Sequence, residues 1–149
     1  MKVLLVASTG GHLAQLLAVG DAWSAHERHW VTFRKADALS ALAGEKVTWA
    51  FHPTTRNAWN ALRNQVLAVV TLLRDRPDVV VSTGAGVSVP FFVAARVLRV
   101  RTMYIEVFDR VDEPTLSGRL NYPLSDAFCL QWDEQLSAYP EGVVVGRTL

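Results

Sequence analysis

Short apolar segments alternate with amphipathic segments along the whole chain. The apolar segments are rich in β-branched and aromatic residues and end at glycine, proline or polar residues, as strands do. The segments between them repeat apolar side chains every three or four residues, as helices do. We expect strands at residues 2–8, 28–34, 47–52, 79–83, 102–108, 127–132 and 142–146, and helices at 12–26, 36–43, 57–76 and from the turn at 84–86 to 97.

This order of elements predicts an α/β fold, a doubly wound, Rossmann-like parallel sheet with helices on both faces. The strand at 79–83, "VVVST", starts with three valines, which is typical of a strand buried on both faces. We see no linker, repeat or low-complexity tract, so residues 1–149 are expected to form a single domain. Ligands of such sheets bind beyond the carboxyl ends of the strands where the strand order reverses, usually between the first and fourth strands.

Those two strands end in glycine turns, "STGGH" at residues 8–12 and "STGAG" at 82–86, which should face one crevice. The start of a helix offers unpaired N–H groups and partial positive charge, and glycine lets an anion approach the backbone. The hydroxyls of Ser8, Thr9, Ser82 and Thr83 can add donors. The pair of turns therefore favours a phosphate-bearing ligand, although a tight turn needs glycine whatever its function.

Two familiar phosphate motifs are not matched. "GAGVSV" has Val89 where a dinucleotide-binding motif has its last glycine, and "STGGHL" lacks the Gly-Lys-Ser/Thr ending of a P-loop. An NAD-dependent or ATP-splitting enzyme is therefore disfavoured. His12 can donate to a phosphate or act as a base towards a hydroxyl, or it is simply a residue at the helix entrance. The other histidines have no metal-site spacing and are interpreted as structural or surface residues.

The stretch from Tyr104 to Trp132 places a carboxylate in an otherwise apolar strand. Glu106 lies near the edge at which the crevice is expected, and a buried carboxylate is costly unless it is paired or opens to a site. Arg110 and Arg119 are available partners for a structural ion pair. The alternative is that Glu106 acts as a base or accepts a hydrogen bond from a sugar hydroxyl.

The composition of the chain argues against several classes of protein. A net charge of +1 and a pI near 8.0 argue against nucleic-acid binding through bulk charge. The chain is 50% hydrophobic and 19% charged, which argues against disorder. The single cysteine, Cys129, forms no intramolecular disulfide and suits a reducing cytoplasm. We see no secretory signal, and no apolar run reaches the roughly 20 residues that cross a bilayer.

Four stretches occur in the order seen in one family: "ASTGGHLAQLL", "PDVVVSTGAGVSVPF", "IEVFDRVDEPTLSGRLNYPLSDAFCLQW" and "VVVG". They resemble the PssD-type subunit of bacterial exopolysaccharide and capsule glycosyltransferases. That subunit is similar to the membrane-associated subunit of the eukaryotic transferase that adds the second GlcNAc to dolichol-diphosphate-GlcNAc. The resemblance covers nearly the whole chain.

The resemblance implies a GT-B glycosyltransferase split over two chains, of which this is the amino-terminal, acceptor-side half. A separate donor-side subunit would hold most of the UDP-sugar, and the acceptor would be a polyprenyl-diphosphate-linked sugar. The chain would be peripheral on the cytoplasmic face of the membrane, with no metal and no cofactor. It departs from the eukaryotic subunit in that we expect no amino-terminal membrane anchor. The catalytic residues expected are His12 and Glu106, and the substrate-binding residues are Ser8, Thr9, Gly10, Gly11, Thr83, Gly84, Gly86, Val87 and Arg110.

The helix expected at residues 57–76 carries an apolar stripe that includes Trp59, Val66 and Leu73. Together with Arg56 and Arg63, this stripe could form a patch at a membrane interface. We expect it instead to pack on the core, with only the exposed amino-terminal turn facing a membrane. Two other functions stay open. One is a non-catalytic scaffold that recruits and activates a partner glycosyltransferase, and the weaker one is a self-sufficient nucleotide-binding enzyme such as an epimerase or reductase.

Overall fold

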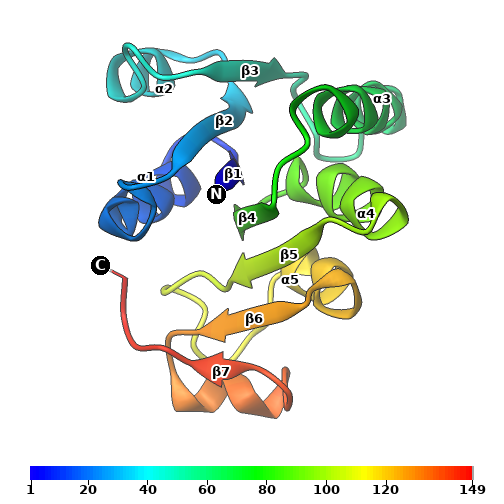
Figure 1. The fold of residues 1–149 in the computed structure, drawn as a ribbon. Coiled ribbons are helices and arrows are strands. Elements are labelled where there is room, and N and C mark those ends of the chain that lie inside the picture. The colour runs from blue at the N-terminus through cyan, green and yellow to red at the C-terminus, as the bar shows by residue number, and fades with distance from the viewer. Residues whose placement is uncertain (149) are drawn as a thin grey trace.

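The computed structural model describes residues 1–148 and contains one seven-stranded sheet in the order β3-β2-β1-β4-β5-β6-β7 (Figure 1). Every neighbouring pair of strands is parallel. The predicted doubly wound, Rossmann-like fold is therefore confirmed. The strands are β1 (Lys2–Ala7), β2 (Glu27–Phe33), β3 (Val47–Ala50), β4 (Val79–Gly84), β5 (Arg101–Ile105), β6 (Ala127–Leu130) and β7 (Val143–Val144).

Helices cover both faces of this sheet (Figure 1). Helices α1 (Gly11–Ala18) and α2 (Ala36–Ala41) lie on one face, and α3 (Ala58–Asp75), α4 (Ser88–Leu98) and α5 (Leu116–Asn121) on the other. Three short 3₁₀ helices complete the described chain: η1 (Gly20–Trp23), η2 (Tyr122–Leu124) and η3 (Asp133–Ser137). The sequence pattern did not predict α5 or η3, because neither repeats apolar side chains for more than two turns.

The central strand β1 is apolar because it is buried on both sides. Leu4 and Val6 belong to the cluster that packs under α3 and α4. Val3, Leu5 and Ala7 belong to the cluster under α1 and α2. The alternation along one strand thus divides the core into two layers, one on each face of the sheet.

The strand order reverses between β1 and β4, which are hydrogen-bonded neighbours. After β1 the chain turns to α1 on one face of the sheet, and after β4 it turns to α4 on the other face (Figure 1). The two glycine turns therefore start side by side at the carboxyl ends of these strands, as predicted. We call residues 8–12 the first elbow and residues 82–87 the second elbow.

The side of helix α3 that faces the core is part polar and part apolar, and it is not the apolar stripe, which contradicts the prediction that the stripe packs there. Asn64 is fully buried and binds both backbone polar groups of Phe51, just after β3 ends, at 2.9 Å each. Asn60 is buried too and donates to the carbonyl of Pro53 at 2.9 Å. Because these amides must face the loop after β3, the apolar stripe of the helix turns outward. Its members are 52–67% exposed: Trp59, Leu62, Val66, Val70 and Leu73.

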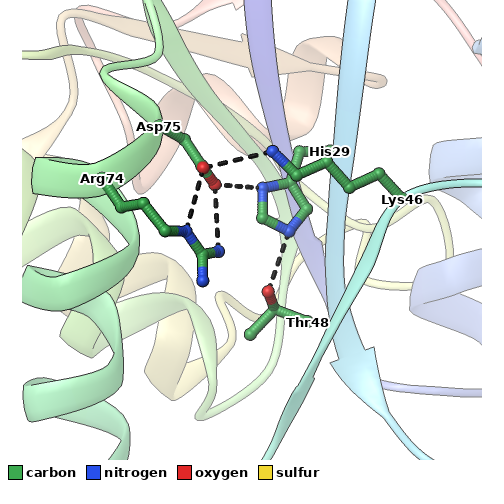
Figure 2. A network of polar contacts seen from close by, with 5 residues as sticks. All are labelled: His29, Lys46, Thr48, Arg74 and Asp75. Atoms are coloured by element: carbon green, nitrogen blue, oxygen red, sulfur yellow. Dashed lines mark hydrogen bonds and ion pairs between the residues drawn. The ribbon is translucent and has the colours of Figure 1, made fainter.

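A polar network at the other end of α3 fastens this helix to β2 and β3 (Figure 2). Asp75 contacts His29 Nδ1 at 2.5 Å, Lys46 Nζ at 3.1 Å and Arg74 Nε at 3.1 Å. His29 Nε2 lies 2.8 Å from the hydroxyl of Thr48. Burial lowers the pKa of His29 and outweighs the opposing attraction of Asp75. This histidine thus has a structural role, as the sequence indicated.

Candidate functional site

The first elbow presents backbone N–H groups at the start of α1. Gly10 has φ +78° and ψ −137°, a conformation that only glycine adopts readily, and a Cβ added there would meet open space. Its N–H donates to the Asp37 carboxylate at 2.8 Å. The first helical bond of α1 runs from Ala14 N–H to Gly10 C=O at 3.0 Å, so the N–H groups of Gly11 and His12 precede it. The elbow therefore already binds one carboxylate oxygen and can offer further donors.

The second elbow uses its polar groups mainly within the protein. Gly84 has φ +113°, and a Cβ there would clash with the Tyr104 hydroxyl, so this glycine is required by packing. Its N–H donates to Ser82 Oγ at 2.9 Å, and Ser82 and Val87 are fully buried. The structure therefore differs from the expectation that Ser82 offers its hydroxyl to a ligand. Only Gly86 among these residues is exposed.

His12 is tied to the second elbow by two hydrogen bonds with Thr83. His12 Nδ1 lies 2.8 Å from the Thr83 carbonyl oxygen, and Thr83 Oγ1 donates to the His12 carbonyl at 2.6 Å. A carbonyl oxygen can only accept, so Nδ1 carries the proton and Nε2 of the neutral ring keeps a free lone pair. Thr83 was predicted to bind a ligand, but its side chain is only 1% exposed. Its role in the structure is to position His12.

Two cavities meet at His12. A cleft of about 180 Å³ lies between the first elbow and the loop after β5, and Gly11, His12 and Arg110 line it together. A groove of about 740 Å³ runs on the other side of His12. The loops supply much of its polar lining, including Thr54, and the helices α3, α4 and α5 supply its apolar lining. The groove is lined by His12, Thr54, Thr55, Arg56, Ala61, Gln65, Gly86, Val89, Pro90, Thr115, Leu116, Ser117 and Leu120.

Other predicted site residues lie outside these cavities. The hydroxyl of half-buried Ser8 donates to the Thr9 carbonyl at 3.3 Å, and neither residue lines the cleft or the groove. A separate cavity of about 610 Å³, lined by Arg96, Arg99 and Arg101 among others, lies at the opposite edge of the sheet, where β5 begins. It shares no lining residue with the elbows, so the candidate site is the pair of cavities at His12.

Glu106 is fully buried and lies directly after β5. Within residues 1–148 it has no arginine partner, which excludes the structural Glu–Arg pair that the sequence left open as an alternative. Its carboxyl group accepts hydrogen bonds from the Tyr139 hydroxyl at 2.6 Å, the Val107 N–H at 2.9 Å and Thr115 Oγ1 at 3.2 Å. Burial and the bond to Glu106 raise the pKa of Tyr139, so its hydroxyl stays protonated and donates. A Cβ at Gly118 would overlap this carboxylate, which explains the glycine of "SGRL".

Three side chains after β6 hold the loop that borders the cleft. Gln131 donates to the Glu106 carbonyl at 2.8 Å, and Trp132 Nε1 donates to the Phe108 carbonyl at 2.6 Å. Gln135 donates to the carbonyl of Arg110 at 2.9 Å. The "QW" pair of the sequence is thus explained as a support for this loop. Sequence reasoning missed Gln135, Tyr139 and the Thr54 loop, since no local motif marks them.

The fold and the paired cavities define the class of this protein: a Rossmann-like domain of the kind that forms one half of a GT-B glycosyltransferase. Its family follows from sequence. A family model described as "Oligosaccharide biosynthesis protein Alg14 like" matches residues 52–148, and the chain belongs to this family. The resemblance drawn from the sequence motifs is confirmed, as is the expectation of a glycosyltransferase subunit at the level of the family.

Named relatives agree with this assignment. The chain is 29% identical over 180 residues to the "UDP-N-acetylglucosamine transferase subunit ALG14" of Mus musculus, covering 99% of this chain and 82% of the relative. It is 26% identical over 144 residues to the "UDP-N-acetylglucosamine--N-acetylmuramyl-(pentapeptide) pyrophosphoryl-undecaprenol N-acetylglucosamine transferase" of Carboxydothermus hydrogenoformans. That match covers 85% of this chain and 37% of the relative.

Solved structures show the same fold. Acinetobacter baumannii MurG matches with a TM-score of 0.69 at 19% identity, covering 89% of this chain and 42% of MurG. The UDP complex of S. aureus MnaA matches with a TM-score of 0.75 at 13% identity, covering 99% of this chain and 44% of MnaA. This chain thus spans less than half the length of these proteins, and at such identities the match establishes the fold alone.

Proposed function

We propose that this chain is the acceptor-binding subunit of a two-component, UDP-sugar-dependent glycosyltransferase. Its acceptor is a polyprenyl-diphosphate-linked sugar of exopolysaccharide or capsule biosynthesis, reached from the cytoplasmic face of the membrane. The observation that carries the proposal is the position of His12. Its Nδ1 is held by Thr83, and its ring lies where a small cleft meets a groove with apolar helical walls.

Each part of such an acceptor has a matching surface. Gly11, His12, Asp109 and Arg110 are among the residues that line the cleft. The N–H groups at the helix start and the guanidinium of Arg110 suit a diphosphate. The apolar groove walls formed by Val89, Pro90 and Leu116 suit the first units of the polyprenyl chain. The relative from Carboxydothermus hydrogenoformans is named for a pyrophosphoryl-undecaprenol substrate, which supports this acceptor class.

In this proposal His12 is the general base. Nε2 takes the proton of the acceptor hydroxyl while that oxygen bonds to the anomeric carbon of the donor sugar, and the bond to UDP breaks with its electron pair leaving on UDP. Glu106, predicted as a second candidate base, is assigned a positioning role. Its oxygens are taken up by Tyr139, Val107 and Thr115, and they hold the loop that carries Arg110.

A donor-side partner completes the enzyme. The mouse relative in the family is named as a subunit of a transferase, which supports a partner chain. Holding a nucleotide-sugar opposite the acceptor requires a second domain across the crevice. We therefore expect turnover with UDP-GlcNAc and a polyprenyl-diphosphate-sugar only when a co-expressed donor-side subunit is present. Full turnover by this chain alone would contradict the two-component proposal.

The role of His12 is tested with His12→Asn in the assembled complex. The asparagine amide can still donate to the Thr83 carbonyl, but it has no group in place of Nε2. We expect kcat to fall by about 10²–10⁴-fold with the complex intact. His26→Ala, on the chain segment before β2, is the matched control and should keep wild-type turnover. Unchanged turnover of His12→Asn would instead favour the scaffold function, in which the chain only recruits and activates its partner.

A further inference from the structure

The outward stripe of α3 is an unpartnered apolar surface that runs along the whole helix. Its five members, from Trp59 to Leu73, are more than half exposed. The helix has 18 residues and is therefore about 27 Å long. We define the α3 face as these five side chains: Trp59, Leu62, Val66, Val70 and Leu73.

The three helices on this side of the sheet carry more positive than negative charge. Helices α3, α4 and α5 together contain four arginines and one acidic residue, Asp75, whereas the whole chain has 15 basic and 14 acidic residues. Asp75 contacts His29, Lys46 and Arg74, and Arg96 lies 3.8 Å from the Asp126 carboxylate. In the part of the chain that the structure describes, Arg63 and Arg119 have no ion-pair partner. This layer is therefore positive although the protein as a whole is nearly neutral.

The amino-terminal half of α3 lies between two hollows. On one side is a surface hollow of about 310 Å³, lined by Phe51, Trp59, Leu62, Arg63 and Val66. The Arg63 guanidinium lies 3.7 Å from the centre of the Phe51 ring, so its stem and plane cover apolar surface while the charge stays accessible. On the other side the same helix contributes Ala61 and Gln65 to the groove next to His12.

We propose that the α3 face docks on an anionic lipid bilayer, with α3 lying along the membrane surface. An apolar stripe with a tryptophan and flanking arginines is the pattern of a helix that lies in the bilayer interface. The excess of positive charge complements anionic headgroups. The biological role of this contact rests on the proposed function. In this orientation the groove opens beside the bilayer, and a lipid-linked acceptor reaches His12 without leaving the membrane.

Among residues 1–148, no helix has both the length and the apolar character needed to span a bilayer. A surface contact can therefore be measured directly by sedimentation with vesicles. We expect the full chain, without any sugar substrate or partner, to bind vesicles of 70% phosphatidylcholine and 30% phosphatidylglycerol. Binding to pure phosphatidylcholine should be much weaker, and salt should reduce binding to the anionic vesicles.

Variants of exposed positions separate this surface from the fold. Leu62→Ser with Val66→Ser should lower the vesicle partition coefficient about 10-fold or more, because both side chains leave the interface. Arg63→Gln should lower it about 5-fold, on anionic vesicles only. The matched controls lie in and before α2 on the opposite face of the sheet: Leu39→Ser, which is 47% exposed in the wild type, and Lys35→Gln should bind as the wild type does.

Three results would overturn the inference. The wild-type chain could fail to bind anionic vesicles, the α3 variants could bind as tightly as the controls, or the α3 variants could lose the partner subunit while keeping the vesicles. The last result would assign the α3 face to a protein. Unchanged denaturation midpoints show that the variants are folded. Vesicle binding with no sugar transfer would contradict the proposed function alone, and transfer with no vesicle binding would contradict this inference alone.

Discussion

The hydrogen bond between Tyr139 and Glu106 allows a quantitative test of how the loop beside the cleft is held. Both side chains are buried, at 1% and 0% exposure, and their oxygens are 2.6 Å apart. Tyr139→Phe removes the hydroxyl and keeps the ring, which packs on Phe128 with centroids 4.4 Å apart. The change therefore removes one donor and little else.

The expected cost follows from what remains around the carboxylate. Without the Tyr139 hydroxyl, the nearest other donor to Glu106 Oε2 is Thr115 Oγ1 at 3.5 Å, too far for a good hydrogen bond. A hydrogen bond to a charged group contributes about 1.5–3 kcal/mol, and a buried acceptor left without a partner is at the upper end. We expect Tyr139→Phe to lower the free energy of unfolding by about 2–3 kcal/mol.

Tyr122→Phe is the matched control in the same aromatic cluster. The two tyrosine rings are 5.1 Å apart, but the Tyr122 hydroxyl accepts a bond from the exposed N–H of Glu141, which water can replace. We expect a loss below about 1 kcal/mol for this control. Urea denaturation of both variants, followed by circular dichroism, measures the difference in the free energy of unfolding. The dependence of this free energy on urea concentration should be the same in both variants.

A double-mutant cycle with Glu106→Gln isolates the pair. We expect a coupling free energy of at least about 1 kcal/mol between positions 106 and 139. Equal losses for Tyr139→Phe and Tyr122→Phe, or no coupling in the cycle, would refute the reasoning. Glu106 would then be held by something other than its hydrogen bonds, and its positioning role would lose its basis.

Two further predictions concern packing and pH. Gly118→Ala should cost about 1–3 kcal/mol because its methyl group overlaps the Glu106 carboxylate, whereas Gly11→Ala, which faces open space, should cost less than about 1 kcal/mol; denaturation curves compare them. Burial lowers the pKa of His29. Burial raises the pKa of Asp75, but hydrogen bonds outweigh this effect and lower the pKa of Asp75 to about 2. The unfolded chain then binds more protons, so stability should fall as the pH drops below about 6.5 and fall again, by about 1–2 kcal/mol, between about pH 4 and 2. Asp75→Asn should keep the first loss and lack the second, and an unchanged acid profile would contradict this.

The sequence predicted the fold because its signals are local. Alternating apolar strands and amphipathic helices determine a parallel, doubly wound sheet whatever the details of packing, and this sheet brings the ends of β1 and β4 together. The two elbows were visible for the same reason, since a turn between a strand and a helix is encoded by adjacent residues. The position of Arg110 beside Gly11 and His12 was implied by the family resemblance and not by a local pattern.

Partners of buried polar groups were not visible in the same way. Glu106 finds Tyr139 across 33 residues of sequence, and His12 finds Thr83 across 71. Sequence reasoning proposed Glu106 as a base or a sugar-hydroxyl acceptor, with an ion pair to Arg110 or Arg119 as the alternative, because a carboxylate in an apolar strand was the only signal available. Hydroxyl side chains outnumber arginines and lysines in this chain, and only the packing of η3 and α5 around the end of β5 selects among them.

Local pattern alone thus determined the order of strands and helices along the chain, the point at which the strand order reverses, and the glycine elbows. Each of these depends on residues that adjoin one another. The three-dimensional packing decided which way each amphipathic helix turns and which atoms satisfy a buried carboxylate. The stripe of α3 shows the reason: periodicity marks an apolar side but does not say whether the core or the surroundings will cover it. The need of Asn60 and Asn64 to bond the loop after β3 turned that side outward.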